Sequence, residues 1–351
     1  MSEEPKDPFA EKEGMFRSSG ERIVGIAARR IEHGKRSLPF HHGFLDDLLR
    51  RLRMHDLLLL GAWSGVGKTQ MATQLAMSTA EAGGRVAYIA LEAEQDEIEQ
   101  RMQFQIIASQ VQADGVPDHD ELNYVDWSLG FCEHISGYLN EWSEKEVARR
   151  FGNVSTYYKA HQFGDKQLRQ TVMAVKDQVD MVVLDHMHYV DIQDDNENRG
   201  YRELTKTIRD CALSTGKPVV VVVHLRKKDR GGKVIVPTLD DIHGSSDIAK
   251  ICTRSVMLSP AHVVKPQKWY LSPTFVSVPK DRVGGQTRYA AVCQFDRRLQ
   301  RYENSYALGL LSPGGEKWEP VLAPDLPRWA KGADRVYAPN LASKQGAPDA
   351  R

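Results

Sequence analysis

The chain has 351 residues, and its 47 Lys and Arg residues balance 47 Asp and Glu residues, so the formal net charge is zero. This balance excludes a global attraction to nucleic acid, although a local basic patch can still bind a phosphate backbone. The four cysteines show no metal-ligand spacing, so we expect a reduced, cytoplasmic protein. No apolar run approaches the roughly 18 residues of a membrane helix. The N-terminus is polar and acidic, so we expect no secretory signal.

The two ends of the chain differ in composition from its middle. Residues 1–15 are charged and poor in apolar side chains, and residues 326–351 are similar, so we expect both segments to be disordered. Residues 16–37 predict a linker helix, because an apolar side chain recurs every four positions from Ile23 to Ile31 and forms one stripe.

Residues 38–325 alternate apolar runs with helical patterns and are expected to form one domain. Four runs rich in β-branched residues and Leu predict strands that are buried on both faces: 57–63, 85–92, 181–190 and 218–225. This alternation predicts an α/β fold with a mainly parallel central sheet, and the shorter patterns after residue 250 predict antiparallel strands at one edge. Within the domain, residues 103–165 predict a possible helical insertion.

A nearly complete phosphate-binding loop, GAWSGVGKTQ, follows the first predicted strand. It matches the pattern G-x-x-x-x-G-K-[ST] except at the first position, where Ala62 stands. In such loops backbone N–H groups at a helix start bind phosphate, while the Lys contacts the β- and γ-phosphates and the Ser or Thr contacts Mg²⁺. We therefore predict an ATP site with Mg²⁺. The loop residues expected to contact the nucleotide are Ser64, Gly65, Val66, Gly67, Lys68, Thr69 and Gln70.

Two carboxylates end predicted strands, where they face the ligand crevice of a parallel sheet. Asp185 ends an apolar strand at the position of a Walker B aspartate, so we expect it to hold the metal together with Thr69. Glu92 ends the strand after the loop helix and is the candidate base for orienting water. Considered alone, Glu92 is equally consistent with an ordinary acid at a helix start.

Six segments together resemble the DnaB-type replicative DNA helicases of the RecA-like ATPase superfamily, most closely the branch of mitochondrial Twinkle and the phage helicase-primases. The resemblance covers roughly residues 38–303. Its segments are, in chain order, LPFHHGFLDDLLRRLRMHDLLLLGAWSGVGKT, YIALEAEQDEIEQRM, VVLDHMHYV, VVVVVHLRKKDRGGK, LDDIHGSSDIAKICTRSVMLS and VPKDRVGGQTRYAAVCQFD. The chain departs from the family pattern at His243 and Lys250, where relatives commonly have Arg and Gln.

The resemblance implies a RecA-like P-loop NTPase core and several roles. His224 would be the polar sensor of the γ-phosphate, and Lys280 and Arg282 would act on the nucleotide of a neighbouring subunit, which requires a homo-oligomer such as a hexameric ring. Phe295 would stack on the adenine, although an inward core Phe fits the sequence nearly as well. The linker helix would dock on an adjacent subunit, or it packs on its own core.

A basic loop follows the sensor strand and is the candidate contact with single-stranded DNA. Five cations fall within eight residues around two glycines, an arrangement suited to a phosphate backbone, although a solvated charged loop is the alternative. These cations are Arg226, Lys227, Lys228, Arg230 and Lys233.

Two functions therefore fit the sequence. The first is an ATP-hydrolysing, ring-forming DNA translocase or helicase, whose catalytic residues would be Glu92, Lys68, Asp185, His224, Lys280 and Arg282. The second is an ATP-dependent switch or scaffold that assembles on DNA or on a partner protein without processive unwinding. No full N-terminal domain of the family fits in the first 37 residues, so we expect a bare ATPase module that a partner protein recruits.

Overall fold

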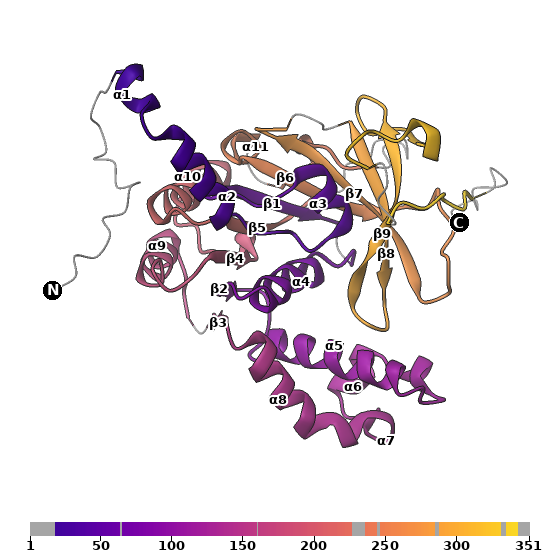
Figure 1. The fold of residues 1–351 in the computed structure, drawn as a ribbon. Coiled ribbons are helices and arrows are strands. Elements are labelled where there is room, and N and C mark those ends of the chain that lie inside the picture. The colour runs from indigo at the N-terminus through magenta and orange to yellow at the C-terminus, as the bar shows by residue number, and fades with distance from the viewer. Residues whose placement is uncertain are drawn as a thin grey trace.

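A mixed β-sheet forms the centre of the protein in the computed structural model (Figure 1). Its ten strands have the order β10-β9-β8-β7-β6-β1-β5-β4-β2-β3. The structure describes residues 18–63, 65–159, 161–226, 236–243, 246–284, 288–330 and 335–342.

Six neighbouring strands of this sheet are parallel, and the remaining four are antiparallel, as the sequence predicted. The parallel strands are β1 (Leu57–Ala62), β2 (Val86–Ala90), β3 (Val154–Tyr158), β4 (Met181–Asp185), β5 (Val219–His224) and β6 (Arg254–Pro260). The antiparallel strands are β7 (Leu271–Asp281), β8 (Tyr289–Asp296), β9 (Arg301–Leu311) and β10 (Trp318–Pro320).

Helices cover both faces of the parallel strands, which explains why those strands are apolar on both sides. On one face pack α3 (Gly43–Leu49), α4 (Lys68–Glu81), α5 (Glu97–Ala113) and α8 (Asn140–Phe151). On the other pack α9 (Asp165–Ala174), α10 (Glu197–Thr215) and α11 (Ser246–Ile251). Every residue of β1 and β4 is buried.

The stretch 103–165 is mainly helical but also contains a strand that the sequence analysis missed. Helices α5 and α8, with α6 (Tyr124–Ser128) and α7 (Glu133–Ser136) between them, form a layer at one end of the molecule with its own small core (Figure 1). Strand β3 then adds to the sheet edge beside β2. Its VSTYY sequence alternates between half-buried and exposed positions, so it lacks the continuous apolar run of the central strands.

The N-terminal helical segment does not bury its apolar stripe on this chain. It consists of α1 (Ser19–Ile23) and α2 (Ile26–Arg36), separated by Gly25 at a φ of 76°. Neither helix contains a buried residue, and Ile23 and Ile31 are each 60% exposed. Figure 1 shows α1 at the tip of an arm that leads away from the sheet. The interpretation that the apolar stripe of the linker helix packs on the core of its own chain is therefore wrong. The interpretation that this helix docks on an adjacent subunit stays a prediction.

Part of the segment expected to be a disordered tail is ordered, so that expectation is wrong for the described residues of 326–342. Ala330 is fully buried, and Trp329 packs against Phe44 and Tyr289. Val336 pairs with Tyr306 of β9, and Leu341 pairs with Val264. Aromatic and apolar residues spaced along a polar segment have no helical or strand period, and this is why the pattern resembled disorder.

A buried histidine makes folding sensitive to acid. His42 is 3% exposed, and burial lowers its pKa to about 4. Because the unfolded chain binds a proton near pH 6.5 and the folded chain only near pH 4, the free energy of unfolding falls as the pH drops through this window, by about 3 kcal/mol for this group.

We expect His42→Phe, which keeps an aromatic ring beside Tyr302, to reduce this acid sensitivity. Urea unfolding at pH 7 and at pH 4.5 measures it, with His134→Phe as the control because His134 is exposed on α7. An equal loss of stability in the wild type and in His42→Phe would contradict the prediction.

Candidate functional site

The phosphate-binding sequence forms a loop between β1 and α4. Gly65 and Gly67 both have positive φ, at 79° and 89°, and Gly67 is the N-cap of α4. This conformation favours glycine and turns the first N–H groups of the helix toward the loop, where they form an anion site. Ala62 ends the buried strand before the loop, so the missing glycine of the motif lies in the sheet and not in the phosphate turn.

Residues of β8 and β9 support this loop from one side. The Tyr302 hydroxyl donates a hydrogen bond to the carbonyl of Val66 at 2.5 Å, and its ring lies 5.0 Å from that of Phe295. A Cβ atom on Gly67 would lie 3.3 Å from the Tyr302 hydroxyl and 3.5 Å from the Phe295 ring. The sequence analysis missed Tyr302, which is 236 residues from Val66 along the chain and carries no motif of its own.

Lys68 and Glu92 meet beside the loop. The Lys68 ammonium lies 3.8 Å from a carboxylate oxygen of Glu92, which follows β2 and is 35% exposed. The predicted base, Glu92, and the predicted phosphate-binding cation, Lys68, therefore lie next to each other at the carboxyl edge of the sheet.

Asp185 lies behind them at the end of β4 and is only 2% exposed. The Tyr88 hydroxyl donates to its Oδ2 at 2.8 Å, whereas Oδ1 is buried without a partner among the described residues. Burial and, to a smaller extent, the charge of Glu92 raise the pKa of Asp185 to about 6, against the hydrogen bond from Tyr88 and the charge of Lys68. A buried carboxylate oxygen without a partner, close to a Thr hydroxyl, fits the oxygen donors that Mg²⁺ prefers.

His224 belongs to a group of histidines of which the sequence predicted only this one. Its ring centroid lies 3.9 Å from that of His186, and His188 is 5.0 Å from His186. Burial lowers the pKa of all three rings, to about 4 for His188, so they are neutral at pH 7. His186 follows Asp185 directly, so the sequence contained this signal in its Asp-His pair.

A cleft of about 570 Å³ opens next to the loop. Gly65 and Val66 line it together with Phe295, Trp269 and Arg297. Phe295 is half-buried and Trp269 is 64% exposed, so two aromatic rings are available beside the phosphate site. A planar base can stack on either ring. Trp269 is a second residue that the sequence analysis missed.

Lys280 and Arg282 lie at the opposite edge of the sheet. Lys280 pairs in register with Ser255 near the start of β6, and its ammonium donates to the carbonyls of Ala249 and Lys250 at 2.6 and 2.9 Å. The backbone N–H of Arg282 donates to Thr253, and its side chain is exposed. The structure therefore does not bring these two cations to the phosphate loop of their own chain.

Several predicted residues fall outside the described part of the chain. These are Ser64 of the phosphate loop and Lys227, Lys228, Arg230 and Lys233 of the basic loop. Arg226 is described and follows β5, with its backbone N–H donating to Asp241 at 2.6 Å. The Gln70 side chain is directed to Gln300, with 3.2 Å between the two amides.

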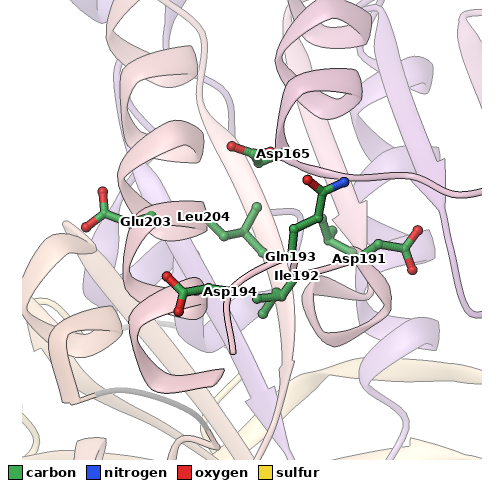
Figure 2. A pocket seen from close by; sticks show the side chains of 9 residues that line it. Asp165, Asp191, Ile192, Gln193, Asp194, Glu203 and Leu204 are labelled. Carbon is green, nitrogen blue, oxygen red and sulfur yellow. The ribbon is translucent and has the colours of Figure 1, made fainter. Parts of the chain in front are cut away.

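A second cavity, of about 270 Å³, lies between the segment after β4 and α10 (Figure 2). Acidic side chains dominate it, and Figure 2 shows the carboxylates of Asp191 and Glu203 directed to opposite sides. Asp191 pairs with Lys159 and Glu203 with Lys206. Negative charge repels a nucleotide phosphate, and no described residue of the phosphate loop lines this cavity, so it is not the nucleotide site.

This fold and site define a P-loop ATPase domain with a RecA-like sheet. A family model described as an AAA domain matches residues 45–230, which is more than half of the chain. The chain belongs to this AAA domain family. No curated protein sequence gives a significant match.

Solved structures share the fold at low sequence identity. One described as an ATPase domain is 15% identical, with a TM-score of 0.65 over 82% of this chain and 99% of that chain. A DnaB-like replicative helicase, described with its interactions with primase, is 15% identical, with a TM-score of 0.64 over 82% of this chain and 67% of that chain. The KaiC-like protein PH0186 from Pyrococcus horikoshii OT3 is 14% identical, with a TM-score of 0.50 over 75% of this chain and 96% of that chain. Among the described helices, none is long and apolar enough to cross a membrane.

We expect Gly67→Ala to weaken ATP binding at least about tenfold, because a non-glycine residue at this φ costs roughly 1–2 kcal/mol and the added methyl crowds Tyr302. Titration with a fluorescent ATP analogue measures the affinity. Gly83→Ala is the matched control, since Gly83 has a φ of 83° with open space around it and lies at the far end of α4. If both variants bind ATP as the wild type does, the loop does not hold the phosphates.

Proposed function

We propose that the chain is an ATP-driven motor of DnaB type that forms a ring and moves along single-stranded DNA. The observation that carries the proposal is the division of the predicted catalytic residues between two edges of one sheet. Lys68 and Glu92 are in contact at the carboxyl edge, and Asp185 and His224 end neighbouring strands there. Lys280 and Arg282 lie at the other edge.

Each residue at the carboxyl edge has a part in ATP hydrolysis. The loop N–H groups and Lys68 bind the phosphates, and Glu92 orients and deprotonates the attacking water. Asp185 and Thr69 would hold Mg²⁺, which supplies positive charge to the β- and γ-phosphates when bound. His224 lies within reach of Glu92 and begins the segment toward the basic loop, so it is placed to respond to the γ-phosphate.

The position of Lys280 and Arg282 supports action between subunits. A cation that stabilises developing phosphate charge accelerates such reactions by about 10³–10⁵. These two cations lie at the edge opposite their own nucleotide site, so we assign them to the site of an adjacent copy. In such a contact, the carboxyl edge of one subunit meets the opposite edge of the next. This head-to-tail arrangement gives a ring if the rotation from each subunit to the next closes on itself.

Contact with DNA is proposed from the sequence of residues 226–233 and from the place of Arg226. Arg226 follows the strand that ends in His224, so the basic loop begins two residues from a candidate sensor of the phosphate state. Backbone binding by such a loop would be independent of base sequence.

A switch or scaffold that does not unwind duplex DNA is the second candidate function, and the layer formed by α5–α8 favours it. Leu129, Phe131 and Tyr138 are each more than 60% exposed there, and exposed apolar side chains of this kind are typical of a surface that binds a partner. A forked-duplex assay with ATP separates the two functions, because strand separation requires the motor and a scaffold gives DNA-bound assemblies without separated strands.

We expect Glu92→Gln to lower ATP turnover by about 10²–10⁴ through loss of the base. ATP affinity should be retained or increased, because a negative charge beside the phosphates is removed. Steady-state ATPase and nucleotide titration measure the two quantities. Glu94→Gln is the matched control, an exposed carboxylate two residues away, and it should turn over ATP as the wild type does. Unchanged turnover in Glu92→Gln would refute the assigned base.

We expect Arg282→Ala and Glu92→Gln each to abolish most DNA-stimulated turnover, and an equimolar mixture of the two to regain part of it. In mixed assemblies some sites combine an intact Glu92 with an intact Arg282 from the neighbour. ATPase of mixtures over a range of ratios, with mass photometry for the assembly state, measures this. Turnover that equals the mean of the separate variants at every ratio would show that Arg282 does not act in trans.

A further inference from the structure

We propose that Glu92, His186 and His224 form a binding site for a transition-metal ion, with Zn²⁺ the best fit, separate from the Mg²⁺ site expected at Asp185 and Thr69. One potential ligand atom from each of the three side chains lies within 4.8 Å of the others. Two imidazoles and a carboxylate are a ligand set that Zn²⁺ takes, whereas Mg²⁺ prefers oxygen donors.

The free nitrogen of His186 is the strongest sign of a ligand. This side chain is 0% exposed, and its Nε2 is buried without a hydrogen-bond partner among the described residues. A buried polar atom of this kind costs free energy unless it is satisfied. Both His224 and Glu92, which stand within reach of it, are partly open to solvent, so an ion can enter from the nucleotide side.

A chain of histidines lies behind His186 and can accept the hydrogen that a metal ligand carries on its other nitrogen. Nδ1 of His186 lies 3.3 Å from Nδ1 of His188, and Nε2 of His188 lies 3.3 Å from the carbonyl of His243. The carbonyl can only accept, so Nε2 of His188 carries hydrogen, and its Nδ1 accepts from the backbone N–H of His224 at 3.5 Å. The backbone N–H of His188 donates to Nδ1 of His186 at 3.3 Å, so in the metal-free chain Nδ1 of His186 accepts and its Nε2 carries the hydrogen. An ion that binds Nε2 of His186 requires the other tautomer, in which the hydrogen has moved to Nδ1, where Nδ1 of His188 can accept it. Metal-bound histidines commonly donate their other N–H to such a second group, which fixes the ring.

The geometry needs one adjustment to bind an ion. Ligand atoms about 2 Å from a tetrahedral Zn²⁺ lie roughly 3.3 Å apart, closer than the 4.8 Å limit of this group. The Glu92 side chain is 35% exposed and must leave the Lys68 ammonium, 3.8 Å away, to rotate toward the buried ring. Binding would occupy the carboxylate proposed as the base, so Zn²⁺ should also inhibit ATP hydrolysis. That second consequence rests on the proposed function, and metal binding itself does not.

The test is a metal titration of the full, nucleotide-free chain after treatment with a chelator. Zn²⁺ is added in competition with a chromophoric chelator, in a large excess of Mg²⁺, and Co²⁺ absorption reports the coordination. We expect one tight site in the wild type and in His134→Ala, an exposed histidine on α7. His224→Ala and Glu92→Gln should bind more than about 100-fold more weakly, because loss of an outer-shell partner alone costs about 10- to 100-fold.

His188→Gln serves as the test of the positioning residue and should weaken binding about 10- to 100-fold while all three ligands remain. Circular dichroism checks that each variant is folded. Wild type that binds no Zn²⁺ in excess Mg²⁺, or His224→Ala and Glu92→Gln that bind it as the wild type does, would overturn the proposal. Because no nucleotide is present, these results are independent of whether Glu92 proves to be the base in the ATPase assay.

Discussion

The parallel alignment of the central strands is the constraint on which the rest of the site depends. Parallel strands all end at one edge, so the segments after β1, β2, β4 and β5 meet there although they are far apart in the chain. The register makes this specific, since Ala62 pairs with His224 and Ala90 pairs with Asp185. A one-residue slip of either pair would turn each of these side chains to the other face of the sheet.

A buried ion-pair group connects the parallel and antiparallel parts. Arg254 at the start of β6 is 1% exposed and pairs with Asp56 at 3.2 Å and Asp281 at 3.0 Å. Removing one partner from such a group commonly costs about 3–5 kcal/mol, because it leaves a charge buried alone. Asp281 lies between Lys280 and Arg282, so this group holds the two predicted trans-acting cations at the edge opposite the phosphate loop.

Most of the fold was predictable because its strands are buried on both faces and read as continuous apolar runs. The sequence predicted less well the elements that have other physical origins. Strand β3 is an edge strand with two of its five side chains exposed, and residues 335–342 are ordered by pairing with β9 and with Val264. At the site, the sequence predicted Lys68, Glu92, Asp185 and His224, which end or follow strands. It missed Tyr302 and Trp269, whose position depends on how the antiparallel strands lie against the loop, and local spacing carries no information on that.

The same edge of the sheet therefore presents two donor sets with different chemical preferences. Asp185 and Thr69 offer oxygen, while His186 and His224 offer neutral imidazole nitrogen, with Glu92 next to both Lys68 and the imidazoles. Divalent ions of the first transition row bind nitrogen sites more strongly than Mg²⁺ does, so selectivity rests on which ligands can close around the ion. Burial of His186 removes water as a competing partner. In the proposed scheme, a carboxylate placed between Lys68 and these two imidazoles would be shared by two equilibria, and occupation of one site would change the charge that the other contains.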